Sequence, residues 1–135
     1  MARITKVQIF NSVLGLLKYL ERTKDQFPKG AGREYKERIS HIVLYELIPF
    51  LKDAYESKGD QKRRLDALKS FKNSLDILSY VLKLCSDFHW ISVTHMAKIS
   101  LMIDDIETQC NSWIKRTKAS GSESEDLLVD GECPK

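Results

Sequence analysis

Two long segments of the chain carry apolar residues in alternating steps of three and four, and this periodicity restricts the fold more than any other feature. They span about residues 60–86 and 92–118. Such steps place the apolar side chains on one face of an α-helix, whereas a strand would need alternation in steps of two. The matched faces predict two long helices that pack together through Leu68, Phe71, Leu75, Leu78, Leu82 and Cys85 and through Met96, Ile99, Ile103, Ile106, Cys110 and Trp113.

Two further helices are expected before residue 58. One spans about residues 5–23 and should end before Pro28, because a proline disfavours helix at the residue before it. Its apolar positions are Val7, Phe10, Val13, Leu14, Leu17 and Leu20. The other spans about residues 33–57, and Pro49 inside it should either kink it or break it in two. Four helices with short connections predict an all-α, up-down-up-down antiparallel four-helix bundle.

Charge is divided unevenly along the chain, whose formal net charge is +3. Residues 1–118 contain 21 basic and 14 acidic side chains, whereas residues 119–135 contain five acids and one lysine. The second stretch is polar and low in complexity, so we expect a bundle over residues 1–118 and an acidic, disordered tail over residues 119–135. A basic body with an acidic tail is typical of proteins that contact nucleic acid.

The sequence argues against several classes of protein. No apolar run approaches the roughly 18–20 residues that span a bilayer, and the N-terminus lacks the apolar core of a secretion signal. We therefore expect a cytoplasmic protein. Three cysteines without a CxxC pair indicate neither a disulfide framework nor a zinc site.

Signatures of catalysis and of bound metals are weak. A di-iron bundle needs paired Glu-x-x-His motifs, and the nearest approach is Glu37 and His41, which are four residues apart and have no counterpart. Cys85 and Cys110 each complete an apolar face, which indicates inert core thiols rather than nucleophiles. The chain has no glycine-rich phosphate loop. We expect no enzyme activity, no metal and no cofactor.

Basic residues gather in segments that an antiparallel bundle would bring to one end, where the third helix starts and the fourth ends. Lysines and arginines there can neutralise phosphates and release condensed counterions. The alternative is that they are ordinary solvated helix faces. The candidate nucleic-acid-binding residues are Lys62, Arg63, Arg64, Lys69 and Lys72, supported by Arg116 and Lys118.

The second and third helices carry more apolar surface than one neighbour can cover. Residues 42–51 are apolar almost all round, and a second apolar stripe runs beside the main face of the third helix. A helix with more than one apolar face needs more than one partner surface. We therefore expect self-association through Leu44, Leu47, Ile48, Leu51, Ile77, Val81 and Leu84.

Several short motifs add a family resemblance over about residues 7–118. They are Phe27-Pro28-Lys29 after the first helix, the run from Leu78 to Leu84, the Asp87–Ser92 connection, and the run from Ile103 to Lys115 with Ile106 and Trp113. In these the chain resembles the accessory variability determinant (Avd) family of diversity-generating retroelements. The same superfamily includes four-helix proteins encoded in ribosomal-RNA intervening sequences.

The resemblance implies a barrel-shaped homopentamer with a basic surface that binds a reverse transcriptase and the template-repeat RNA or its cDNA. Such a protein catalyses nothing itself and supports mutagenic cDNA synthesis and retrohoming. The acidic tail lies outside the resemblance. Two alternatives stay open, namely an intervening-sequence-type bundle that binds ribosomal RNA and a helical adaptor that binds only protein.

Overall fold

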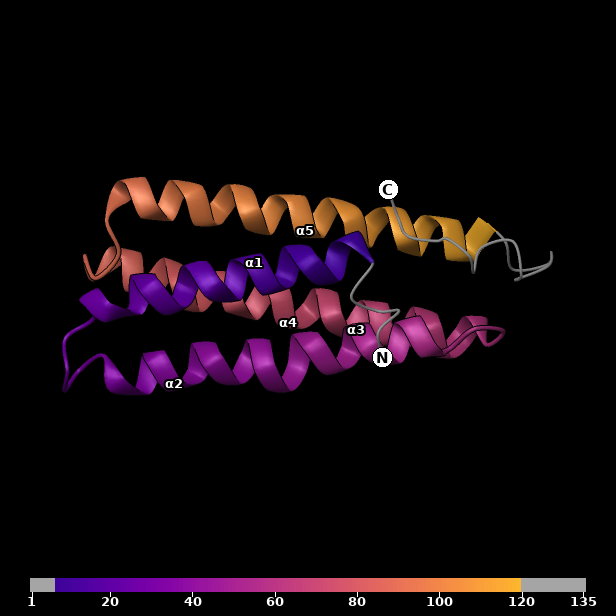
Figure 1. Cartoon of the computed structure of the whole chain (residues 1–135), viewed down its shortest axis with the longest axis horizontal. Helices are drawn as coiled ribbons and strands as arrows, with labels where there is room; N and C mark the ends of the chain where they lie inside the picture. The colour runs from indigo at the N-terminus through magenta and orange to yellow at the C-terminus, as the bar shows by residue number, and fades with distance from the viewer. Residues whose placement is uncertain (1–6, 120–135) are drawn as a thin grey trace.

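The computed structural model describes residues 7–119, and the regular structure among them is entirely helical (Figure 1). The predicted all-helical character is therefore confirmed for this part of the chain, while the predicted tail lies almost wholly outside it. The helices are α1 (Gln8–Thr23), the short 3-10 helix η2 (Lys24–Gln26), α2 (Arg33–Ile42), the π-helical η3 (Val43–Leu47), α3 (Ile48–Glu56), α4 (Gln61–Asp87) and α5 (Val93–Ala119).

The helices lie side by side along one long axis, and the segment from α2 to α3 forms one continuous helical rod (Figure 1). In this view α1 and α4 run in one direction across the picture, while α2, α3 and α5 run in the other. The end of α5 consequently lies beside the start of α4. None of the described helices is both long enough and apolar enough to cross a membrane.

The core consists largely of the apolar faces that the periodicity predicted. On α4 and α5 the predicted positions are buried, apart from Met96, which is partly buried. On α1 the predicted Val7, Val13 and Leu20 are buried, whereas Phe10, Leu14 and Leu17 are only partly buried. Ile9 and Leu16, which the prediction did not include, are also buried. More than one set of apolar positions on α1 could face the core. The packing of α1 against α5 determines which set is buried.

The helix around Pro49 does not break; it changes its hydrogen-bonding pattern just before the proline. The backbone N–H of Ile48 donates to the carbonyl of Val43, five residues earlier, which defines the π-helical turn. Pro49 then lies in the first turn of α3, where a missing N–H is tolerated best. A π-helical turn is one of the ways in which a helix accommodates such a local defect.

Candidate nucleic-acid interface

The first turn of α4 and the last turn of α5 are joined by hydrogen bonds at one end of the molecule. Asp60 Oδ1 accepts a hydrogen bond from the backbone N–H of Arg63 at 3.1 Å and so caps α4. Gln61 Nε2 donates to the carbonyl of Thr117 at 2.9 Å. This contact brings the basic residues that begin α4 next to those that end α5.

Five lysines on these two helices form what we call the lysine cluster: Lys62, Lys69, Lys72, Lys115 and Lys118. Lys62, Lys69 and Lys72 follow one another in steps of seven and three, so they share one side of α4. Lys72 is the only one of these three that is partly buried. The ammonium of Lys62 lies 3.1 Å from a carboxylate oxygen of Asp66.

Three members of the lysine cluster are exposed cations without a carboxylate partner in the described structure. Lys69, Lys115 and Lys118 are exposed, and none of them forms a salt bridge to another residue within 7–119. An exposed ammonium without a carboxylate partner can bind a phosphate, because no existing ion pair has to break first. The structure therefore leaves positive charge available at this end.

Arg64 lies in the interior, so the prediction that it binds phosphate is wrong. Arg64 is only 3% exposed to solvent. Its Nε donates to the carbonyl of Ala54 at 2.9 Å, and its Nη2 donates to the carbonyl of Tyr55 at 3.4 Å. Its guanidinium carbon lies 5.6 Å from the centroid of the Trp113 ring. Arg64 therefore satisfies carbonyls at the end of α3, which have no intrahelical donors, and binds that end to α4 and α5.

The burial of Arg64 follows from a signal that is present in the sequence. It lies four residues before Leu68, and so it extends the buried face of α4 toward the N-terminus. A charged residue in the register of a core face has to find polar partners inside the fold. The prediction grouped Arg64 with its basic neighbours, although its position matches the buried face of α4.

The two remaining candidate arginines are intermediate cases. Arg63 Nη2 lies 2.7 Å from Asp53 Oδ1, in a pair that solvent reaches. Exposed pairs of this kind contribute little free energy, so a phosphate can compete for the guanidinium. Arg116 is partly buried near the end of α5.

The residues predicted for self-association separate into core and surface. Leu47 and Leu51 are fully buried in the core of a single chain, so the prediction that they line an interface is wrong. Leu44 is 43% exposed and Leu84 is 46% exposed. Ile48, Ile77 and Val81 are partly buried.

Two exposed tyrosines add to the apolar surface and were missed by the sequence reasoning, which counted only aliphatic residues. Tyr45 follows Leu44 in η3, and Tyr80 lies four residues before Leu84 on α4. Both side chains are largely exposed. Their spacing from the predicted leucines is the signal that could have identified them.

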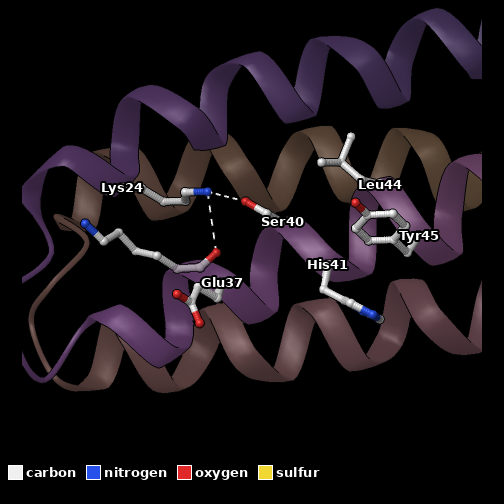
Figure 2. A pocket seen from close by; sticks show the side chains of 7 residues that line it. Lys24, Glu37, Ser40, His41, Leu44 and Tyr45 are labelled. Carbon is white, nitrogen blue, oxygen red and sulfur yellow. Dashed lines mark hydrogen bonds between the residues drawn. The ribbon is translucent and has the colours of Figure 1, made fainter.

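An open pocket of about 520 Å³ lies between the end of α1 and the outer side of α2 and η3 (Figure 2). The buried Lys24 donates to Glu21 Oε2 at 3.0 Å, to the carbonyl of Lys36 at 3.4 Å and to the hydroxyl of Ser40. The other residues that line the pocket are Glu37, His41, Leu44 and Tyr45.

The role of Lys24 in the pocket is to connect helices, because its acceptors lie on both α1 and α2. His41 is exposed, and its Nδ1 lies 3.5 Å from Glu46 Oε2. The other carboxylate oxygen of Glu46 accepts a hydrogen bond from Ser74 at 2.9 Å. Glu46 thus connects η3 to α4.

Both described cysteines are buried, as predicted for core thiols. Burial raises the pKa of Cys85 to about 11 and that of Cys110 to about 12. The reactive thiolate is therefore strongly disfavoured at neutral pH. Among residues 7–119 no group of three or more histidine, cysteine or acidic side chains is arranged to hold a metal ion.

Comparisons with models of known protein families, with curated proteins and with solved structures found no match to this chain.

Proposed function

We propose that the chain is a non-enzymatic nucleic-acid-binding scaffold that acts as the accessory protein of a diversity-generating retroelement. In this role it binds the reverse transcriptase and the template-repeat RNA or its cDNA, and it supports mutagenic cDNA synthesis and retrohoming. The observation that carries the nucleic-acid part is the lysine cluster, in which Lys69, Lys115 and Lys118 have exposed ammonium groups and no salt bridge within residues 7–119. The retroelement part rests on the sequence resemblance.

Lysine side chains favour phosphate binding without base recognition. An ammonium is a point charge on a flexible stem, and it does not offer the planar fork with which arginine recognises guanine. Binding should therefore be tolerant of sequence and driven by counterion release. For a single strand, the slope of log K against log salt is about −0.7 for each phosphate that is neutralised.

Self-assembly is the second part of the proposal. We propose that the helices form an up-down-up-down bundle and that copies associate side by side into a homopentamer. The support is two pairs of exposed apolar side chains, Leu44 and Tyr45 in η3 and Tyr80 and Leu84 on α4. Exposed apolar patches mark interaction surfaces.

Light scattering on the full chain tests the assembly. We expect a particle of about five times the 15.6 kDa mass of one chain. Replacement of Leu84 by lysine should reduce that mass, because it would place a charge in the proposed interface. A single-chain particle under all conditions would contradict the assembly while leaving RNA binding open.

A pair of charge reversals tests the nucleic-acid interface. The double variant Lys69→Glu/Lys118→Glu should bind single-stranded RNA at least about tenfold more weakly, with a salt slope about 1.4 smaller in magnitude, since two contacts are lost. The matched control is Lys18→Glu/Lys29→Glu, which makes the same change in net charge at exposed lysines outside the cluster. Equal weakening by both variants would show that net charge, rather than this surface, governs binding.

The retroelement assignment is tested by the reverse transcriptase. A gene for that enzyme beside a pair of near-identical repeats should accompany the gene for this chain, and the purified enzyme should co-sediment with the full chain. An insertion of the gene within a ribosomal-RNA gene would instead favour the intervening-sequence alternative.

A further inference from the structure

The chain leaves the described structure next to its own lysine cluster. Lys115 and Lys118 belong to the last turns of α5, which ends at Ala119. Lys62 begins α4 beside them, because the neighbouring Gln61 is hydrogen-bonded to Thr117. The residues after Ala119 therefore start at the edge of a surface that holds unpaired positive charge.

The sequence that follows carries the opposite charge. Glu123, Glu125 and Asp126 lie within four consecutive residues that contain no lysine or arginine. Two acids at the start of α4 are already engaged, since Asp66 pairs with Lys62 and Asp60 caps the helix. The acidic residues of this segment are therefore candidate anions for Lys69, Lys115 and Lys118.

The distances allow the contact. The three acids are four to seven residues beyond Ala119, so a fully extended chain carries them at most about 13–25 Å from the end of α5. Lys69 is eight residues after Gln61, which is about 12 Å along α4. The cluster lies within the volume that the acids can reach.

We infer that the acidic segment Glu123–Asp126 docks in cis on the lysine cluster and competes there with nucleic acid. Tethering over so few residues gives the segment an effective concentration in the millimolar range, even if each individual ion pair is weak. Incoming RNA has to displace the segment, so the contact restrains binding and sharpens its dependence on salt. The competition rests on the proposed RNA binding, whereas the contact itself does not.

The competition is tested in the full chain with a labelled single-stranded oligouridylate as the probe. The variant Glu123→Gln/Glu125→Gln/Asp126→Asn removes three negative charges from the segment with little change in shape. The matched control Asp25→Asn/Glu34→Gln/Asp104→Asn removes three exposed negative charges elsewhere on the bundle. Fluorescence anisotropy at about 0.1 M salt should show about tenfold tighter binding for the first variant and at most about twofold for the control.

The contact is tested separately, without RNA, by amide chemical shifts of residues 123–126. These shifts should move when Lys69→Glu/Lys118→Glu is introduced into the full chain, and also when salt is raised to about 1 M, where screening acts within about 3 Å. They should stay unchanged in the Lys18→Glu/Lys29→Glu control.

The two measurements distinguish the possible failures. Shifts that respond as expected, in a protein that binds no oligouridylate, would reject the proposed function and keep the contact. Equal tightening by the two triple variants would overturn the competition, because net charge alone would explain it. Chemical shifts that change neither in Lys69→Glu/Lys118→Glu nor at about 1 M salt would overturn the contact.

Discussion

The two ends of the bundle are closed by different chemistry. At one end, where α1 turns into α2 and α4 turns into α5, four aromatic rings pack together. Phe27 and Trp90 have ring centroids 5.6 Å apart, and Tyr35 lies 5.2 Å from Trp90 and 5.8 Å from Phe88. At the other end a buried arginine and a glutamine satisfy the backbone carbonyls of neighbouring helices.

The difference shows how the molecule separates stability from binding. The rings of the aromatic end bury apolar surface and hold the α1–α2 connection against the α4–α5 connection. This end therefore contributes mainly to the stability of the fold. The basic end holds its helices with the hydrogen bonds of Arg64 and Gln61, and these leave the long lysines around them in solvent. The basic end can therefore accept substitutions of its lysines with little loss of stability, whereas substitution of a buried ring at the aromatic end should be costly.

The largest effect is expected from Phe27→Ala. Phe27 is buried against Trp90, so its loss should lower the free energy of unfolding by about 3–4 kcal/mol. Phe88, which is 44% exposed, is the matched control, and Phe88→Ala should cost about 1 kcal/mol. Urea unfolding measures both. If the two variants lost similar amounts of unfolding free energy, burial of Phe27 would not be what stabilises this end.

At the basic end, Arg64→Met should lower the free energy of unfolding by about 2–3 kcal/mol, because two buried carbonyls lose a charged donor. Arg63→Met, which removes only an exposed pair with Asp53, should cost less than about 1 kcal/mol. Chemical unfolding of the two variants makes the comparison. A larger loss for Arg63 would contradict the account of how this end is closed.

The buried thiols predict a loss of stability at alkaline pH. Burial raises the pKa of Cys110 from 9.0 to about 12, so the folded state holds the proton more tightly than the unfolded chain. This contribution is fully present below pH 9.0 and is lost as the pH rises toward about 12, with about 1.4 kcal/mol gone by about pH 10. Cys85, nearer the aromatic end, should lose its contribution between 9.0 and about 11.

The variant Cys110→Ala isolates this effect. Its stability at neutral pH should be lower because of the cavity, but it should fall less steeply than that of the natural chain between about pH 9 and about pH 10. Unfolding curves at a series of pH values measure the two slopes. Parallel slopes would show that Cys110 does not bind its proton more tightly in the folded state.

The smallest effect is expected at the cap of α4. Asp60→Ala removes the acceptor for the N–H of Arg63 and should cost about 1 kcal/mol, whereas Asp60→Asn keeps an acceptor and should cost only a few tenths. Thermal melting compares the two. Equal costs would mean that charge, and not the hydrogen bond, is what Asp60 contributes.

Much of the fold could be predicted because it depends on local sequence. The three-four periodicity of α4 and α5 marked the core residues. The burial of Cys85 and Cys110 followed from the same periodicity. These features need no knowledge of which helices are neighbours.

The candidate site was only partly predictable, because the roles of its residues depend on neighbours. Lys69 and Arg64 look alike as members of a basic run, yet one is exposed and the other is buried between α3 and Trp113. Leu44 and Leu47 look alike as members of an apolar run, yet the π-helical turn and the packing around it expose the first and bury the second.

The sequence by itself determined that residues 7–119 are helical, where most of the helices begin and end, and that one group of basic residues lies around the start of α4 and the end of α5. Those properties follow from hydrogen bonds and side-chain spacing within a few residues of each other. Only the tertiary structure decided which face of α1 is buried, that Arg64 closes one end, and which lysines remain in solvent, because burial is settled by surfaces that come from distant parts of the chain.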